Sequence, residues 1–274
     1  MNKETCSIRY FFEDQNYRIK VLCFGELGKI FSDSFSEKLP GNFILQFVED
    51  SGELQQQEMT SVSKNEMLML ITEYEPDIWK MHLENDQIRK NLENVELSFI
   101  VIHPKNGIVP VEEQRLLQLM GGKENYYKLI LAMPDMNRKK ALETMCWTIY
   151  DIIASTTKIG YVNLDYTDLL YPGHHYNWYG TVYEGECRNC RQLQQLTKDI
   201  CAQITKDMLT EEILSALMII TSRHNETILN IANVVGEIEK ILSENTTLTW
   251  GHILTESECA ITLVLFREME EEFA

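Results

Sequence analysis

A short loop with two glycines and a lysine has the residue types of a phosphate site. The loop is Gly25-Glu26-Leu27-Gly28-Lys29, and it follows an apolar run. Backbone N–H groups of such loops bind anions when a helix starts there. A Walker loop needs four residues between its glycines and a Ser or Thr after its lysine, whereas two residues intervene here and Ile30 follows. The pattern favours a tight strand-to-helix turn, with a nucleotide site as the alternative.

An amide and two carboxylates lie close together in the segment 162–169, at Asn163, Asp165 and Asp168. A carboxylate can accept a proton from a water that attacks a phosphate. The same residue types also cap helix ends, because their oxygens accept hydrogen bonds from backbone N–H groups. Spacing alone favours capping.

Two cysteines, Cys187 and Cys190, form a C-x-x-C pattern. Further possible ligands are His174, His175 and Cys201. A structural zinc site needs four ligands, and a second pair at matching spacing is missing from the sequence. The expected polar helix over 187–205 would place both cysteines on one face, so this pair is a weak candidate and we expect no metal.

The composition is that of a globular protein with an acidic surface. The 274 residues include 42 Asp and Glu against 25 Lys and Arg, a formal net charge of −17. This charge repels nucleic acid and anionic lipid, and no apolar run reaches the roughly 20 residues of a membrane span. We expect a cytoplasmic protein with no nucleic-acid partner and no direct membrane insertion. Only 13 glycines are present, which weakens any prediction of glycine-rich phosphate loops.

The first half of the chain predicts alternating strands and helices. Continuous apolar runs are typical of parallel strands that are covered on both faces. Such runs occupy 18–24, 43–48, 96–102 and 127–133. Helical spacing is expected over 29–39, before Pro40, and over 66–92 on both sides of Pro76. This order predicts an α/β, Rossmann-like doubly wound domain.

The second half predicts a long helix followed by an α+β domain. The long helix covers 138–155. Further strands are expected over 175–183, 214–221, 246–254 and 260–266. A polar helix over 187–205 and an amphipathic helix over 226–242, capped by Asn225, lie between them.

The C-terminal block resembles the end of the core of the tubulin/FtsZ superfamily. Its helix carries a V-G-x-x-I pattern, here Val235-Gly236-Glu237-Ile238 with one residue less. A W/I-G strand follows at Trp250-Gly251, and then an acidic turn and a last strand of alternating apolar residues. The resemblance covers about fifty residues. It implies two domains joined by a central helix.

The segment 162–169 resembles the synergy loop of FtsZ, an N-x-D-F/Y-x-D-V/L segment after the central helix. Asn163, Asp165 and Asp168 all match. In FtsZ these carboxylates reach the nucleotide of the neighbouring filament subunit and help to position the attacking water. The resemblance implies that the three residues act in trans on a partner's GTP, and it implies no catalytic residue in cis.

The phosphate loops depart from the superfamily pattern. A G-G-G-T-G-T/S-G box, whose N–H groups bind phosphates, should follow the strand 96–102. The sequence there is His103-Pro104-Lys105-Asn106-Gly107-Ile108-Val109-Pro110, and its prolines cannot donate N–H bonds. In the first loop, Glu26 would repel a triphosphate. The remnant of the phosphate site is Gly25, Gly28 and Gly107, so we expect no cofactor, with GTP as the alternative.

The resemblance implies three parts of the chain. These are a degenerate nucleotide-binding-type α/β domain over 1–137, a central joining helix over 138–158 and an FtsZ-like α+β domain over 159–274. It implies a non-enzymatic protein in cell division or a cytoskeleton, which binds itself or an FtsZ-type filament subunit through its synergy-loop face. Two alternatives stay open: an atypical GTPase that polymerises, and a stand-alone protein whose fold serves an unrelated ligand.

Overall fold

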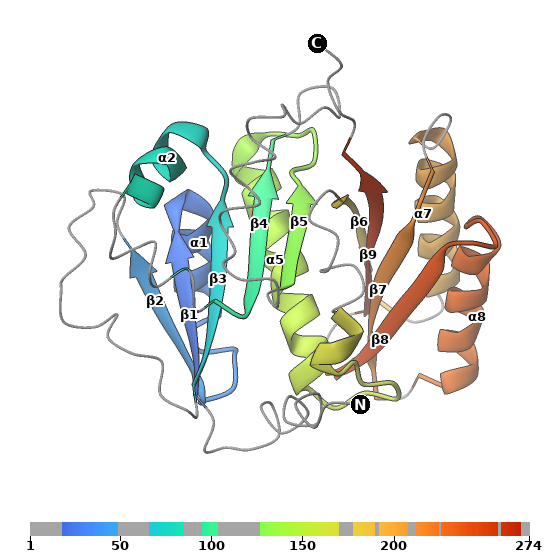
Figure 1. Cartoon of the computed structure of the whole chain (residues 1–274). Helices are drawn as coiled ribbons and strands as arrows, with labels where there is room; N and C mark the ends of the chain where they lie inside the picture. Colours follow the sequence, from blue (N-terminus) through green and yellow to red (C-terminus); the bar gives the residue numbers. More distant parts are fainter. Residues whose placement is uncertain are drawn as a thin grey trace, which may run out of the picture.

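Helices cover both faces of one twisted sheet in the computed structural model of the chain (Figure 1). The structure describes residues 18–48, 66–84, 92, 95–103, 127–169, 178–189, 192–207, 212–224, 226–256 and 259–269. Within these ranges, nine strands are hydrogen-bonded in the order β2-β1-β3-β4-β5-β6-β9-β7-β8. The predicted α/β class is confirmed.

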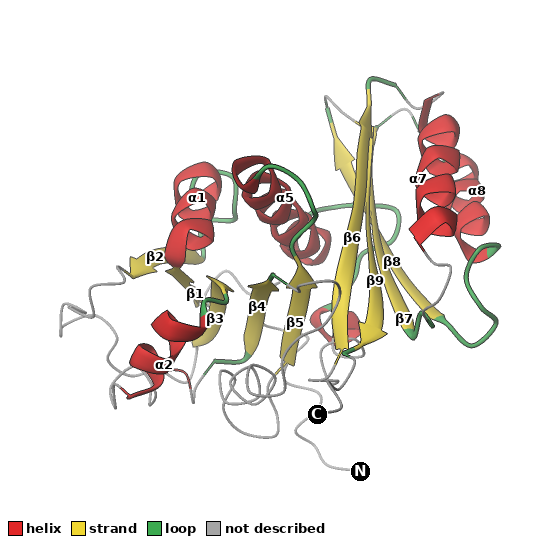
Figure 2. Cartoon of the chain, turned by 90° about the horizontal axis from the view of Figure 1, so that it is seen from above, coloured by secondary structure: helices red, strands yellow, loops and turns green. Residues whose placement is uncertain are grey.

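Five parallel strands form the N-terminal part of the sheet. They are β1 (Arg18–Phe24), β2 (Phe43–Val48), β3 (Glu66–Glu73), β4 (Leu97–Ile102) and β5 (Tyr127–Ala132). Figure 2 shows helices α1 and α5 on one face of these strands and α2 on the other. This double cover explains why all six residues of β4 are buried, and why the strands have continuous apolar runs.

The prediction of helix over 66–92 is wrong for its first eight residues, which form β3. The Met and Leu residues of β3 favour helix by intrinsic propensity. Burial decides otherwise, because alternate residues such as Met67 and Leu68 face the apolar cores on opposite sides of the sheet. The helix after it, α2 (Pro76–Glu84), begins at proline, which suits a first helical position.

Helix α1 (Gly25–Phe35) begins directly after β1, four residues earlier than predicted, and ends before the predicted Leu39. Gly25 has a φ of 68°, a conformation that other residues adopt only with strain. At Gly28, a Cβ would lie 2.6 Å from the carbonyl carbon of Cys23. Structure therefore accounts for both glycines: Gly25 allows the sharp turn, and Gly28 allows the helix to pack closely on the strand.

The central helix α5 (Arg138–Thr157) is confirmed. The side chain of Asn137 caps it by accepting a hydrogen bond from the backbone N–H of Lys139, at 3.1 Å. Figure 2 shows α5 in the angle between the N-terminal and C-terminal strands. Its buried residues, such as Ile149 and Ile153, join one apolar core with residues of both halves.

The C-terminal half has its own strands and two covering helices. In chain order these are β6 (Trp178–Cys187), α7 (Leu193–Asp207), β7 (Ser215–Arg223), α8 (Ile228–Glu239), β8 (Thr247–Thr255) and β9 (Cys259–Glu268). β9 is antiparallel to both β6 and β7, and β7 is parallel to β8. Helices α7 and α8 lie on the side of these strands away from α5 (Figure 2).

Two local predictions in this half need correction. The polar helix expected from residue 187 begins at Leu193, because ten residue pairs with β9 extend β6 as far as Cys187. The N-cap of α8 is Thr227, whose side chain accepts a hydrogen bond from the Asn230 N–H, rather than Asn225, which lies outside the described residues.

The two halves meet at a short pairing between β5 and β6. Two residue pairs join them, Leu131 with Gly180 and Ala132 with Thr181. At Gly180 a Cβ would lie 2.3 Å from a side-chain carbon of Val264, so glycine allows this close approach. The division into 1–137, 138–158 and 159–274 stays a prediction.

Candidate functional site

Polar side chains gather where β1, β3 and β4 end. These strands end at the upper edge of the sheet in Figure 1. The strand-end cluster comprises Glu26, Glu73, Glu75, His103 and Arg138. Its carboxylates and Arg138 line a cavity of about 180 Å³, together with Gly25. The carboxyl ends of parallel strands are where open α/β sheets bind their ligands.

Glu73 is the centre of the strand-end cluster. Its side chain is 2% exposed, and its Oε1 lies 2.8 Å from the Arg138 guanidinium and 2.5 Å from His103 Nε2. Its backbone carbonyl accepts a hydrogen bond of 3.1 Å from the Trp79 ring N–H. Arg138 also bonds Glu26 at 3.2 Å and Glu75 at 3.3 Å. Three carboxylates therefore share one guanidinium.

This arrangement opposes an anionic ligand. A phosphate in the cavity would meet the carboxylates of Glu26, Glu73 and Glu75, and the arginine that could bind it already bonds all three. The carboxylates are also favourable at the start of α5, because this end of the helix dipole is positive and Arg138 adds a further positive charge there.

Sequence reasoning identified Glu26 in this region and missed Glu73, Glu75 and Arg138. The expected helix over 66–92 hid the fact that Glu73 ends a strand beside β1. Arg138 was identified as the start of a helix, and its distance in sequence from Glu26 concealed their contact. Residues 104–110, including Gly107, lie outside the described residues.

A second polar region follows the C-terminal end of α5, at the opposite end of the molecule. Residues 159–163 run beside β8: the N–H of Leu254 donates to the Ile159 carbonyl at 3.1 Å, and the N–H of His252 donates to the Val162 carbonyl at 2.8 Å. The Tyr161 ring stacks on the His252 ring, with centroids 5.0 Å apart and planes inclined by 15°. These contacts hold the loop firmly against the sheet.

His252 is buried and joins this loop to β7. Its Nδ1 accepts the Tyr161 N–H at 3.1 Å, and its Nε2 lies 2.8 Å from Ser222 Oγ. A neutral ring with its proton on Nε2 satisfies both contacts. Burial lowers the pKa of His252 to about 4, although the Glu226 carboxylate opposes this shift. The ring is therefore neutral at pH 7.

Asp165 and Asp168 cap one short helical turn, Tyr166–Leu169. The N–H of Asp168 donates to Asp165 Oδ1 at 3.2 Å, and the N–H of Asp165 donates to Asp168 Oδ2 at 2.8 Å. This reciprocal pair is a capping box made with aspartates. Asn163 is exposed, and its Oδ1 accepts the Gly160 N–H at 2.9 Å. All three predicted residues thus lie in one segment, where they have structural roles; their action on a partner's nucleotide stays a prediction.

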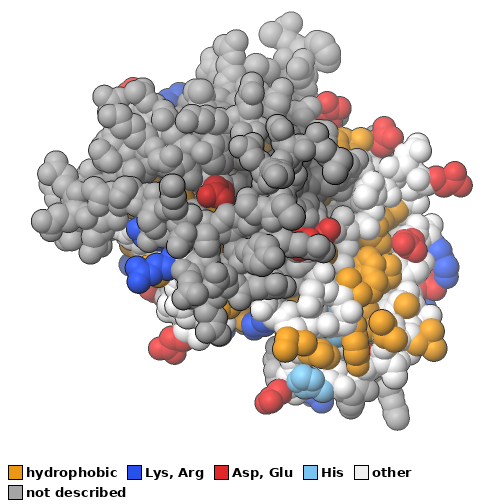
Figure 3. Space-filling model, turned by 60° about the horizontal axis from the view of Figure 1, so that its bottom comes forward, with side chains coloured by type: hydrophobic (Ala, Val, Ile, Leu, Met, Phe, Trp, Pro, Cys, Tyr) orange, Lys and Arg blue, Asp and Glu red, His pale blue; other side chains and the backbone are white. Residues whose placement is uncertain are grey.

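Exposed apolar side chains surround this segment. Ile159 is 78% exposed and Leu229, at the start of α8, is 68% exposed, with Tyr161 and Ile228 also exposed. The hydroxyl of Tyr161 donates to the Glu226 carbonyl at 2.8 Å, which brings residue 161 next to the start of α8. We call Ile159, Tyr161, Asn163, Ile228 and Leu229 the loop face. Figure 3 shows hydrophobic side chains gathered on this lower side of the molecule.

The weak candidates for a zinc site do not lie on one helix as expected. Cys187 ends β6 and lies opposite Cys259 of β9, while Cys190, His174 and His175 are outside the described residues. Among the described residues, no three His, Cys, Asp or Glu side chains are grouped to hold a metal ion. Nor do the described helices include one that is long and apolar enough to cross a membrane.

Comparison with known proteins finds similarity in structure but not in sequence. Neither a protein-family model nor a curated protein matches the sequence. The chain superposes on FtsZ from M. jannaschii with a TM-score of 0.60 and 11% identity, covering 100% of this chain and 98% of that one. TubZ from Bacillus thuringiensis serovar israelensis, solved as GDP-form protofilaments, superposes with a TM-score of 0.56 and 12% identity, covering 99% of this chain and 90% of that one.

CetZ from Methanosaeta thermophila gives a TM-score of 0.54 and 9% identity, covering 93% of this chain and 87% of that one. These three proteins match over nearly their whole length, so the similarity includes both halves of the sheet and the helix between them. The protein therefore has a tubulin/FtsZ-like fold.

Proposed function

We propose that this protein is a non-enzymatic relative of the filament-forming FtsZ and tubulin-like proteins, and that it binds an FtsZ-type filament subunit through its loop face. The carrying observation is the loop face itself: four exposed apolar side chains beside the capped pair Asp165 and Asp168. Contiguous exposed apolar groups on a rigid surface are typical of protein interfaces.

The opposite end of the molecule supports the non-enzymatic part of the proposal. A head-to-tail filament joins two different surfaces of each subunit, so every subunit needs both. The strand-end cluster gathers three carboxylates around Arg138 at the carboxyl ends of the parallel strands, where open α/β sheets bind their ligands, and this negative charge supports the expected lack of a bound nucleotide. A subunit with a binding surface at one end and this cluster at the other would join a filament end and stop its extension.

Co-sedimentation with polymerising FtsZ tests the proposal. The wild-type chain should pellet with the filaments and reduce their mean length. The double variant Ile228→Ser with Leu229→Ser should remain in the supernatant, because it removes two exposed apolar contacts. Met136→Ser, which changes an exposed apolar side chain at the other end of α5, is the matched control and should pellet like wild type.

The acidic pair is tested separately. Asp165→Asn with Asp168→Asn retains oxygen acceptors for the cap but removes both charges. If the pair assists the partner, the wild-type chain should change the GTP hydrolysis rate of FtsZ, and this variant should bind without changing that rate. Absence of co-pelleting by the wild type, or equal pelleting of the Ile228/Leu229 variant, would contradict the proposed interface.

A second candidate is a GTP-binding protein that polymerises by itself. It is favoured by the similarity to TubZ, which was solved in GDP form. Thermal unfolding with and without GTP and Mg²⁺ separates the candidates, because a ligand at 100 times its Kd stabilises by about 2.7 kcal/mol. We expect no shift in melting temperature; a saturable rise that Glu26→Gln enhances would favour the GTP-binding candidate.

A further inference from the structure

Two cysteine thiols face each other across two strands of the C-terminal half. Cys187 is the last residue of β6 and Cys259 is the first residue of β9, and the two residues pair directly in the antiparallel register. Both thiols are free; Cys187 is partly exposed and Cys259 is buried. The proposed function uses neither residue.

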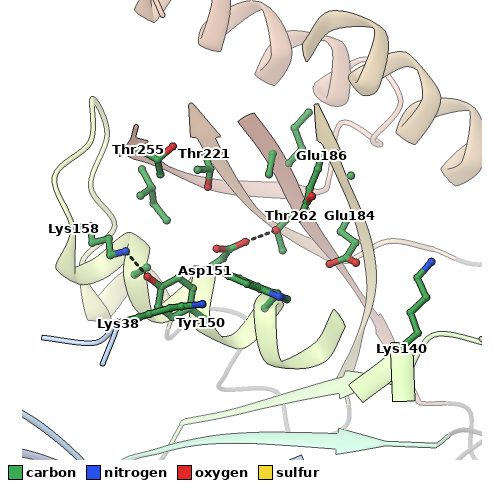
Figure 4. Close-up of a pocket in the computed structure, with 16 residues that line it drawn as sticks. Lys38, Lys140, Tyr150, Asp151, Lys158, Glu184, Glu186, Thr221, Thr255 and Thr262 are labelled. Atoms are coloured by element: carbon green, nitrogen blue, oxygen red, sulfur yellow. Dashed lines mark hydrogen bonds between the residues drawn. The ribbon is translucent and has the colours of Figure 1, made fainter. Parts of the chain in front are cut away.

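The two side chains lie on the same face of the sheet, at the margin of an apolar core. Cys259 belongs to the core that α7 and α8 cover, and Cys187 packs against it. Successive residues of a strand point to opposite faces. On the other face of the same strands, Glu184, Glu186 and Thr262 line a cavity of about 510 Å³ beside α5 (Figure 4). The thiols are therefore separated from that cavity by the sheet.

The pairing brings the two sulfur atoms within reach of one bond. Directly opposite residues of antiparallel strands have Cα atoms about 4.5–5.5 Å apart, and a disulfide needs about 4.4–6.8 Å. The Cys259 thiol is near enough to Cys187 for a hydrogen bond between the two side chains. The Cys187 thiol also donates to the Asn189 carbonyl at 3.4 Å, a weak hydrogen bond. A disulfide can therefore form without movement of the backbone, at little loss.

Two other cysteines are candidate partners of Cys187. Cys190 completes the C-x-x-C pattern of the sequence and lies outside the described residues. Cys201 of α7 also packs against the core, but its thiol donates to the Glu237 carbonyl at 3.8 Å and so is directed at α8. The register of β6 and β9 favours Cys259 over both.

The surroundings of Cys187 make its reaction slow at neutral pH. Burial, the largest cause, raises the pKa of Cys187 to about 11; the Cys259 thiol adds to this shift, and a backbone hydrogen bond at Asn189 opposes it. The thiolate is the nucleophile in thiol–disulfide exchange, and about one thiol in a thousand is ionised three pH units below its pKa. The pair therefore responds to sustained oxidation rather than to a brief exposure.

We propose that Cys187 and Cys259 form an intramolecular disulfide by exchange with a small-molecule disulfide of the glutathione type. The more exposed Cys187 attacks, as thiolate, one sulfur of glutathione disulfide, and one glutathione thiolate leaves. Cys259 then loses its proton and attacks the Cys187 sulfur, which releases the second glutathione thiolate. The two cysteines are oxidised by two electrons, glutathione disulfide is reduced, and the two cysteine protons are taken up by the two glutathione thiolates.

The cross-link closes a long loop of the C-terminal half. The chain between the two cysteines contains α7, β7, α8 and β8, and it carries Ile228 and Leu229 of the loop face. Closing such a loop lowers the conformational entropy of the unfolded chain and so stabilises the folded half. Disulfides of this kind are transient in a reducing compartment, so the stability of this half follows the redox state.

Incubation of the full chain with glutathione disulfide at about pH 8.5, followed by tryptic digestion without reductant and mass spectrometry, tests the proposal. The wild type should give a product in which the peptides of Cys187 and Cys259 are joined. Its formation should be about tenfold slower at one pH unit lower, because less thiolate is present. The oxidised chain should melt about 5 °C or more above the reduced chain.

Cys187→Ser and Cys259→Ala should each abolish both the joined product and the rise in melting temperature. The matched control is Cys201→Ser, which changes another thiol at the margin of the same core and should behave like wild type. Cys190→Ser should also oxidise like wild type. A product that joins Cys187 to Cys190, or glutathione adducts alone, would overturn the proposed pair. A joined product without a rise in melting temperature would overturn its stabilising role.

Discussion

The two ends of the molecule are held together by different interactions. At the strand-end cluster, charged side chains bond one another: Arg138 is shared among Glu26, Glu73 and Glu75. At the loop face, backbone hydrogen bonds and the stack of Tyr161 on His252 hold the chain, while apolar side chains point to solvent. The charged side chains of the strand-end cluster are bonded to one another. The loop face instead presents apolar side chains on a backbone that is held in place. An interaction function therefore suits the loop face better.

The largest effect is expected from His252→Ala, the buried residue on which Tyr161 of the loop face stacks. The change removes a ring of zero exposure, its stack on Tyr161 and hydrogen bonds to Tyr161 and Ser222, so we expect a loss of about 3 kcal/mol in the free energy of unfolding. Urea unfolding measures it. The exposed His224→Ala is the matched control, with a change within about 0.5 kcal/mol. Equal effects would show that the loop is not held through His252.

At the strand-end cluster, Arg138→Ala should cost about 2 kcal/mol, because it leaves the buried Glu73 carboxylate without its guanidinium while Arg138 itself is half exposed. The two variants should differ in salt dependence. The loss of unfolding free energy caused by Arg138→Ala should become smaller as the salt concentration rises, because salt screens charges, whereas the loss caused by His252→Ala should stay constant. Lys139→Ala, on the same helical turn, should be nearly neutral. A salt-independent cost for Arg138→Ala would remove the distinction between the two ends.

Stability should depend on pH with opposite signs at two sites. The pKa of His252 is lowered to about 4, so the unfolded state binds more protons between pH 4 and 6.5, and stability rises with pH there. The pKa of Asp151 is raised to about 6, so the folded state binds more protons between about 3.9 and 6, and stability falls as pH rises there. The ionisable groups facing Asp151 are Tyr150, Lys158, Glu184, Glu186, Lys38 and Lys140, and Glu226 faces His252.

Replacing Asp151 should leave His252 as the main cause of the pH dependence of stability between pH 4 and 6. The stability of Asp151→Asn should rise more steeply than that of wild type between pH 4 and 6, by about 1–2 kcal/mol over the interval. Thermal unfolding across this range measures the difference. Glu239→Gln serves as the exposed control and should parallel wild type. Parallel curves for wild type and Asp151→Asn would contradict the raised pKa.

The smallest effect is expected from Asp168→Ala, which removes one half of the reciprocal cap on Tyr166–Leu169. We expect a loss of about 0.5–1 kcal/mol, typical of a lost helix cap. Asp168→Asn should recover most of this loss, since its amide oxygen accepts the same hydrogen bond. Equal losses for both variants would show that charge, rather than capping, stabilises the turn.

Most strands and helices could be predicted because their signals are local. The strands 18–24 and 43–48 and the central helix have continuous or periodic apolar residues that neighbouring residues alone define. The failures occur where partners distant in sequence decide. Residues 66–73 form a strand because β1 and β4 flank them, and Cys187 extends β6 because β9 is opposite.

The candidate site divides in the same way. Asn163, Asp165 and Asp168 were found as a local pattern, and both the spacing of the aspartates and their observed hydrogen bonds fit a cap. Only part of the strand-end cluster could be predicted from the sequence, because Glu26 and Arg138 are 112 residues apart in sequence and meet across the end of the sheet. His252 gave no sequence signal, since its neutrality depends on burial between Tyr161 and Ser222.

The apolar periodicity, the glycine at the turn from β1 to α1 and the net charge of −17, on which the prediction of no nucleic-acid partner is based, can all be read from the sequence. These properties depend on single residues and their near neighbours in sequence, so they can be recognised before the fold is known. Which charges are compensated depends on contacts that form only when the chain folds. Arg138 is bonded to Glu26, Glu73 and Glu75, which lie 63 to 112 residues away in sequence, because charge interactions depend on distance and burial and not on order along the chain.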